Sequence, residues 1–263
     1  MKEHPSPSHE GISALFLNCS LKGSASESHT QLLMDRVANI MRSQGVLVEN
    51  VYALDHAIAF GMIKDGADEG RADEWPAIQR KIMAADILVL GTPIWLGVKS
   101  SVATLAVERM YAYSGDRNEK GQYLYYGKVG GCVVTGNEDG IKHCSMDILY
   151  ALQHIGYTVP PQADCGWIGE AGPGPSYGDT EWRGEALAAP AGYDNDFTNR
   201  NTTFMAWNLM HAAKILKDAG GIPAIGNTVE GWETVVNAKS DNPSTGNYGP
   251  TDTTQSPNSE TPK

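Results

Sequence analysis

Hydroxyl, amide and lysine side chains are concentrated in residues 18–30, which join a short apolar run to a helical pattern. Ser20, Ser28 and Thr30 supply hydroxyl donors, and Lys22 adds a positive charge. The first turn of a helix leaves backbone N–H groups unpaired and carries a partial positive charge, and together these features bind a phosphate. The segment therefore predicts a phosphate site, with an ordinary capped loop as the alternative.

Two further loops follow expected strands. Residues 91–97 read Gly-Thr-Pro-Ile-Trp-Leu-Gly, which predicts a rigid turn with a large planar side chain, Trp95, at the rim of the sheet; the alternative is a plain turn with Trp95 packed in the core. Residues 135–140 read Thr-Gly-Asn-Glu-Asp-Gly, and the carboxylates of Glu138 and Asp139 either accept hydrogen bonds from a ligand or cap the helix that follows. Because the carboxyl ends of parallel strands meet at one edge of a sheet, we expect these two loops to lie beside the first.

Apolar runs and helical patterns alternate along the chain and define the elements that must position these loops. The expected strands are residues 12–17, 46–54, 87–90 and 129–134, with a weak fifth strand at 157–159 or nearby, and the expected helices are residues 30–44, 73–85, 101–113, 141–155 and 203–219. This alternation predicts an α/β fold with a parallel sheet covered by helices on both faces. Residues 115–127 and 166–200 do not fit the alternation, and we expect functional loops or interface segments there.

The composition excludes several classes of protein. The 263 residues include 20 Lys+Arg and 31 Asp+Glu, a net charge of −11, which argues against binding nucleic acid or an anionic membrane surface. No apolar run approaches the ~20 residues of a membrane-spanning helix, so we expect no membrane insertion, and the polar N-terminus lacks a secretory pattern. Four scattered cysteines form no C-x-x-C motif, so we expect no metal site, reduced thiols and a cytoplasmic location.

The two ends of the chain differ in composition from its middle. Residues 1–10 are polar, and the stretch from residue 240 to the end is rich in Ser, Thr, Asn, Pro and Gly. Such segments bury too little apolar surface to offset their chain entropy. We therefore expect one domain over residues 11–226, a flexible N-terminus over residues 1–10, and a polar, disordered tail over residues 227–263.

Taken together, the loops resemble those of the flavodoxin-like family of NAD(P)H-dependent FMN and quinone reductases. The family's first-loop pattern is matched by Asn18, Ser20, Lys22, Ser28 and Thr30, and its third-strand pattern by residues 91–97. The likeness covers roughly residues 12–220, and it departs at Cys19, where glycine is usual, and in a longer spacing between Lys22 and Ser28. The resemblance implies a flavodoxin-like three-layer sandwich, with a five-stranded parallel sheet in the order 2-1-3-4-5 and helices on both faces.

The resemblance also implies a bound FMN, with its phosphate on the first loop and its isoalloxazine ring over residues 93–97, against residues 135–140. The cofactor-binding residues that it implies are Ser20, Lys22, Ser26, Ser28, His29, Thr30, Pro93, Ile94, Trp95, Leu96, Gly97, Thr135, Gly136, Asn137, Glu138, Asp139 and Tyr177. Tyr177 belongs to a glycine-rich stretch, residues 169–178, that resembles a segment bordering the active site of quinone reductases. No side chain is expected to act as a catalytic acid or base.

The activity that the resemblance implies is transfer of a hydride from NAD(P)H, the co-substrate, through FMN to a quinone, a flavin or another small electron acceptor. The alternative is a flavodoxin-type electron carrier that binds FMN but has no nicotinamide substrate, which the acidic charge suits. The chain length and the glycine-rich stretch favour the enzyme. The resemblance further implies a homodimer or a homotetramer.

Overall fold

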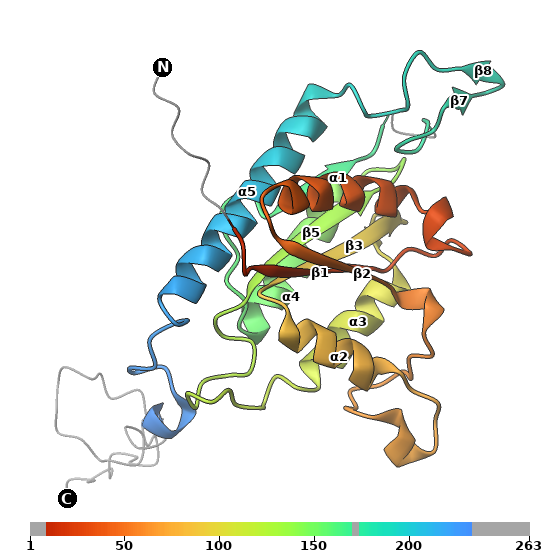
Figure 1. Cartoon of the computed structure of the whole chain (residues 1–263). Coiled ribbons are helices and arrows are strands. Elements are labelled where there is room, and N and C mark those ends of the chain that lie inside the picture. Colours follow the sequence, from red (N-terminus) through yellow and green to blue (C-terminus); the bar gives the residue numbers. More distant parts are fainter. Residues whose placement is uncertain (1–8, 170–173, 233–263) are drawn as a thin grey trace, which may run out of the picture.

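The core of the molecule is a parallel β-sheet. The computed structural model describes residues 9–169 and 174–232. Its parallel strands are β1 (Ser13–Asn18), β2 (Leu47–Tyr52), β3 (Ile87–Trp95), β5 (Val129–Thr135) and β6 (Asp164–Trp167), in the spatial order β2-β1-β3-β5-β6 (Figure 1). The short strand β4 (Val98–Lys99) pairs antiparallel with β3. Counting the parallel strands alone gives the order 2-1-3-4-5, so the predicted flavodoxin-like topology is confirmed.

Five helices cover the two faces of this sheet. They are α1 (His29–Ser43), α2 (Trp75–Ala84), α3 (Ser101–Tyr111), α4 (Ile141–Ile155) and α5 (Asp196–Asp218). Side chains of β1 alternate between two cores, because successive residues of a strand point to opposite faces. Figure 1 shows these helices lying on the two sides of the sheet. Leu15 and Leu17 pack in the core under α2, α3 and α4, whereas Ala14 and Phe16 pack in the core under α1 and α5. Full burial of a Leu or Phe side chain contributes roughly 1.5–3 kcal/mol, so both cores hold the sheet firmly beneath its loops.

Two strands differ from their predicted positions. Strand β3 continues past residue 90 to Trp95, and Pro93 pairs in register with Thr135 of β5. The turn comes later, at Leu96 and Gly97, where β4 folds back. The predicted fifth strand at residues 157–159 is wrong in position, since Thr158 forms only an isolated bridge to Val129 and the true strand is β6. Pro160 and Pro161 follow Thr158, and proline lacks the N–H that a ladder needs.

The last helix begins seven residues earlier than predicted, at Asp196 rather than at residue 203. Asn195 is its N-cap, and its side chain accepts a hydrogen bond from the backbone N–H of Thr198. Buried hydroxyls make the polar first turns compatible with packing, because Thr198 donates to the carbonyl of Gly166 and Thr202 to the carbonyl of Thr198. Residues 166–200 therefore contain ordered elements, including a hairpin of β7 (Glu181–Trp182) and β8 (Glu185–Ala186).

A buried ion pair ties α3 to the segment before α2. The guanidinium of Arg109 and the carboxylate of Asp73 are both fully buried and 2.6 Å apart at their closest atoms. Burial alone would raise the pKa of Asp73, but hydrogen bonds from Arg109 and from the backbone of Ala59, Gly66 and Trp75 lower it to about 2. The carboxylate is therefore ionised at neutral pH.

Both ends of the chain extend beyond the described part. Residues 1–8 and 233–263 lie outside the described residues, so the predicted flexible N-terminus and polar tail fall largely there. The described part reaches residue 232, and the backbone N–H of Val229 donates to the carbonyl of Gly121, within the segment 115–127. Among the residues that the structure describes, no helix has the length and apolar character needed to cross a membrane.

Candidate functional site

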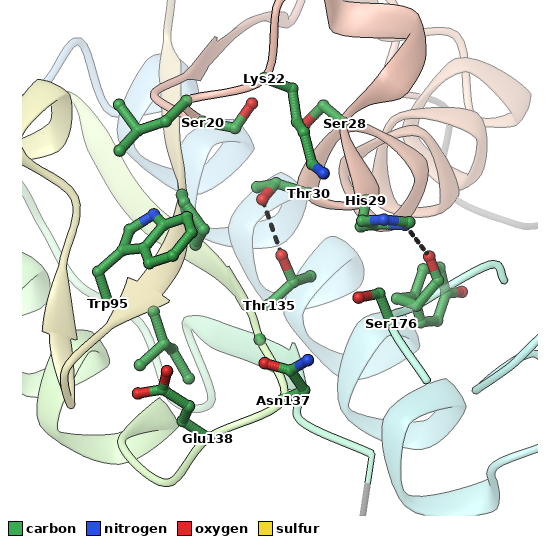
Figure 2. A pocket seen from close by; sticks show the side chains of 15 residues that line it. Ser20, Lys22, Ser28, His29, Thr30, Trp95, Thr135, Asn137, Glu138 and Ser176 are labelled. Atoms are coloured by element: carbon green, nitrogen blue, oxygen red, sulfur yellow. Dashed lines mark hydrogen bonds between the residues drawn. The ribbon is translucent and has the colours of Figure 1, made fainter. Parts of the chain in front are cut away.

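The loops that follow β1, β3 and β5 meet at the carboxyl edge of the sheet around one cavity of about 370 Å³ (Figure 2). A fourth wall comes from Ser176 and Tyr177, which precede α5 in the chain. The lining residues are Ser20, Leu21, Lys22, Ser28, His29, Thr30, Pro93, Ile94, Trp95, Thr135, Gly136, Asn137, Glu138, Ser176 and Tyr177. Residues separated by more than a hundred positions in the sequence therefore share one site.

One end of the cavity is the N-terminus of α1. Ser28 is the N-cap, and its hydroxyl oxygen accepts hydrogen bonds from the N–H of Gln31 at 3.1 Å and from the side-chain amide of Asn18 at 3.2 Å. Because the oxygen accepts both, its own proton is available to a ligand. No hydrogen bond among the described residues uses the backbone N–H of His29 or Thr30. Unpaired N–H groups and the dipole at a helix N-terminus are the kind of donors that bind an anion.

Lys22 adds charge to this end. Figure 2 shows its side chain running past Ser28 toward Thr30, at the entrance to the cavity. Within the described part of the chain the ammonium group makes no ion pair. In a protein of net charge −11 this free cation is directed at the helix N-terminus, where an anion would bind.

The helix N-terminus approaches the sheet closely. The hydroxyls of Thr30 and Thr135 are 2.7 Å apart and form the floor of the cavity (Figure 2). One of the two donates to the other, so one hydroxyl proton remains for a ligand. Gly91 of β3 makes this approach possible, because a Cβ there would lie 2.1 Å from the sulfur of Met34 in α1.

The opposite end of the cavity is formed by the β3–β4 hairpin and the loop after β5. Trp95 is about half exposed, at 51%, and Figure 2 shows its indole on one side with Asn137 and Glu138 below. The two loops touch directly, since a Cβ at Gly140 would lie 2.8 Å from the carbonyl oxygen of Gly97. This end offers a planar apolar surface beside amide and carboxylate groups.

The wall formed by Ser176 and Tyr177 contacts the start of α1 through His29. Its Nδ1 lies 2.9 Å from the carbonyl oxygen of Tyr177 and 3.7 Å from the carboxylate of Asp179. Burial raises the pKa of Tyr177 to about 12, and its ring packs against Trp167 and Tyr193. Residues 176–179 are therefore held against α1 by the buried side chain of Tyr177 and the contacts of His29.

All but four of the predicted cofactor-binding residues line the cavity. The exceptions are Ser26, Leu96, Gly97 and Asp139. Ser26 bonds the hydroxyl of Ser24 in a short 3-10 turn, and Leu96 is 91% exposed at the hairpin tip. Gly97 faces Gly140 with its backbone, and Asp139 is exposed. The structure thus brings most of the predicted set together and leaves these four outside the wall.

Sequence reasoning missed a residue that supports the site from behind. Tyr52, the last residue of β2, is buried, and its hydroxyl donates to the carbonyl of Lys22 at 2.5 Å. Its position could have indicated this role, because β2 ends at the same edge of the sheet as β1 and Tyr52 is its last residue. Cys19, at that edge, is a buried thiol whose pKa burial raises to about 12, so it is no nucleophile. In the described residues no group of His, Cys, Asp and Glu could hold a metal ion.

Comparison with protein families finds one match over most of the sheet. The model of the NADPH-dependent FMN reductase family matches residues 13–167. This range contains the loops after β1, β3 and β5 and all five parallel strands. It ends at Trp167, before the glycine-rich stretch and α5.

Curated relatives and solved structures extend the likeness. The chain is 36% identical over 214 residues, 79% of each chain, to the 8-demethyl-8-aminoriboflavin-5'-phosphate synthase of Streptomyces davaonensis. It is 33% identical, with a TM-score of 0.75 over 88% of each chain, to the crystal structure of RosB with bound intermediate 8-demethyl-8-formylriboflavin-5'-phosphate. A flavone reductase shares the fold, with a TM-score of 0.52 and 14% identity over 79% of this chain and 65% of its own.

One further relative differs in length. The chain is 52% identical over 251 residues, 95% of its length, to a protein of Mycobacterium bovis named as the divalent metal cation transporter MntH. The chain spans 34% of that protein. The match therefore concerns about a third of the longer protein.

Proposed function

The chain belongs to the NADPH-dependent FMN reductase family, a family of flavin-binding oxidoreductases, and we propose that it passes a hydride from NAD(P)H through bound FMN to a quinone, a flavin or another small electron acceptor. The observation that carries this proposal is that the two ends of the cavity carry different kinds of side chain. Phosphate donors gather at one end, and a planar side chain with polar neighbours lies at the other.

The donor set at the α1 end fits the phosphate of a mononucleotide. The hydroxyl of Ser28 and the backbone N–H groups of His29 and Thr30 all belong to the first residues of α1, and Figure 2 shows the side chain of Lys22 running toward the same residues. Most of these donors are neutral, and backbone groups bind an anion even in an acidic protein. Charge-assisted hydrogen bonds of this kind are roughly twice as strong as neutral ones.

The opposite end fits a flavin ring. We assign Trp95 to contact with the ring plane, and Asn137 and Glu138 to hydrogen bonding at its polar edge. When bound, FMN supplies the redox chemistry, which is acceptance of a hydride from nicotinamide and delivery of the two electrons to an acceptor. The chain itself binds and orients the reacting group, and no side chain is assigned as an acid or base.

The test is a flavin-loading experiment followed by reduction. Purified protein is incubated with FMN, separated from free flavin by gel filtration, and mixed without oxygen with NADH or NADPH. We expect the protein to retain flavin absorbance, to lose it with one nicotinamide, and to regain it when a quinone is added. Protein that stays colourless after loading contradicts the proposal, and flavin that neither nicotinamide reduces favours the electron carrier.

A second candidate follows from the Streptomyces davaonensis relative, whose name describes synthesis of a riboflavin-phosphate derivative. In that case the same cavity would hold a flavin phosphate as substrate rather than as resident cofactor. Mass spectrometry of the flavin released after turnover distinguishes the two. An unchanged FMN mass supports the oxidoreductase, and an altered mass supports the flavin-modifying enzyme.

Partners beyond the small-molecule acceptor stay predictions. The homodimer or homotetramer rests on the sequence resemblance, and the cytoplasmic location rests on the cysteine pattern and the composition of the chain. The transporter name belongs to a protein of which this chain spans about a third, so we propose no transport activity from it. Light scattering at micromolar concentration measures the oligomeric state directly.

A further inference from the structure

A buried tyrosine behind the phosphate loop connects β2 to residues 20–22. Tyr52 pairs in register with Asn18, so its side chain lies beside the start of that loop. Its hydroxyl lies 2.5 Å from the carbonyl oxygen of Lys22 and 3.0 Å from the hydroxyl of Ser20. Tyr52 does not line the cavity, and no function described above uses it.

The protons of this cluster can be assigned one by one. A tyrosine hydroxyl has a single proton, and the short contact to the carbonyl of Lys22 uses it. The hydroxyl of Ser20 must then donate to Tyr52, since two hydroxyls 3.0 Å apart need one proton between them. The backbone N–H of Ser20 donates to the side chain of Asn18 at 2.9 Å. Both donors of Ser20 are therefore used within the protein, and none remains for a phosphate.

This assignment divides the loop into an anchor and a binding part. Ser20, Asn18 and Tyr52 hold the loop from behind through buried hydrogen bonds. Lys22 is held by its backbone carbonyl, while its exposed side chain projects toward the N-terminus of α1 (Figure 2). When the backbone of a residue with a long side chain is already fixed, less conformational entropy is lost as that side chain binds a ligand.

We propose that Tyr52 is a positioning residue that directs Lys22 at the phosphate and so selects phosphorylated over unphosphorylated flavins. The inference rests on the proposed function, because it assumes that the cavity binds FMN. It assigns a role to a side chain that does not itself line the cavity but holds two residues that do, Ser20 and Lys22. It also makes Ser20 part of the support rather than a phosphate donor.

The test compares the dissociation constants of FMN and riboflavin, which differ by the phosphate alone. In Tyr52→Phe we expect about tenfold weaker FMN binding and unchanged riboflavin binding, because one buried hydrogen bond is lost and only the phosphate end depends on it. Tyr157→Phe is the matched control. The hydroxyl of Tyr157 is buried and has no hydrogen-bond partner among residues 9–169 and 174–232, so its loss should change neither constant.

A second variant, Lys22→Ala, keeps the test decisive. This exposed side chain can be removed without disturbing the anchor, and we expect the same selective loss of FMN affinity. The double variant should lose little more than either single variant, because both act on one contact. If Tyr52→Phe does not fold, Lys22→Ala alone decides, and an unchanged preference for FMN overturns the inference.

The remaining outcomes separate this inference from the function beneath it. Wild-type protein that binds neither flavin overturns the proposed function and the inference together. Wild-type protein that prefers FMN, with Tyr52→Phe showing the same preference, overturns the inference alone. Equal weakening of FMN and riboflavin in Tyr52→Phe, with a lower melting temperature than Tyr157→Phe, also overturns it, because that result describes a purely structural tyrosine.

Discussion

The two ends of the cavity are held in different ways. At the α1 end, Asn18, Ser28 and Tyr52 are buried and joined by hydrogen bonds to the loop and to the helix cap. At the hairpin end, the side chains of Trp95 and Glu138 make no hydrogen bond within the described residues, and Trp95 is half exposed. One end is polar and is held by buried hydrogen bonds, and the other is open and partly apolar.

This difference indicates a division of labour. Donors that the fold already holds in place lose little conformational entropy when a phosphate binds. Flavin affinity should therefore depend mainly on the α1 end. A half-exposed planar surface leaves room for nicotinamide and for an acceptor to reach the ring, so access should depend mainly on the hairpin end. The predictions below measure each end separately with FMN and riboflavin as probes.

The largest effect is expected at the helix cap. Ser28→Ala removes a phosphate donor and the N-cap of α1, and we expect about a hundredfold weaker FMN binding with little change for riboflavin. Asn195→Ala is the matched control, because it removes the N-cap of α5 away from the cavity. It should lower stability by about 1 kcal/mol and leave both dissociation constants unchanged. A similar loss of riboflavin binding in Ser28→Ala would show that the ends are not separate.

The buried Asp73–Arg109 ion pair should determine how the stability of the fold falls at low pH. The folded-state pKa of Asp73, about 2, lies below the usual value of about 4. A lowered pKa contributes stability that is fully present above about pH 4 and is lost as the pH falls toward 2. Asp73→Asn should lower the free energy of urea unfolding at pH 7 by about 2 kcal/mol and flatten its fall between pH 4 and 2. An unchanged acid slope would contradict the assignment.

At the open end, Trp95→Ala should weaken FMN and riboflavin equally, by about tenfold, because both flavins share the ring that Trp95 contacts. Fluorescence titration of each flavin measures the two constants. A loss confined to FMN would place Trp95 at the phosphate and reverse the assignment of the ends. The melting temperature should change little, since half of the side chain is already exposed.

The smallest effect is expected at the hairpin tip. Leu96 has a φ of +52°, a left-handed conformation that asparagine tolerates better than leucine, and it is 91% exposed. Leu96→Asn should raise the free energy of unfolding by about 0.5 kcal/mol and leave flavin binding unchanged. Urea titration checks the first statement. Weaker flavin binding would show that the tip is part of the site, as the sequence predicted.

The strands that the sequence predicted well are those with continuous apolar runs, such as β1 and β5. Such runs mark a strand covered on both faces, and the pattern is local. Strand β6, with Asp164, Gly166 and Trp167, has no such run and was not located. Its position depends on pairing with β5, which no local pattern encodes. Strand β3 differs in the opposite way, because it is longer than predicted and continues through Pro93. Pro93 lies near the end of the strand, where the absence of its N–H costs no necessary hydrogen bond.

The candidate site could be predicted from the sequence at residues that have an informative side chain and also directly follow a strand. Ser28, Lys22 and Trp95 have informative side chains and follow strands directly, and the topology alone brings those loops together. Tyr52 has the same position but no distinctive motif, and its role appears only from the register of β1 and β2. The proton assignment that removes Ser20 from the donors likewise needs three-dimensional distances.

The central claim is that the α1 end of the cavity binds the phosphate of FMN. Calorimetric titration of the wild-type protein with FMN and with riboflavin, under identical buffer and salt, tests it most directly. The account predicts that both flavins bind to one site and that FMN binds at least about a hundredfold more tightly. Equal affinity for the two flavins, or binding of neither, would contradict it.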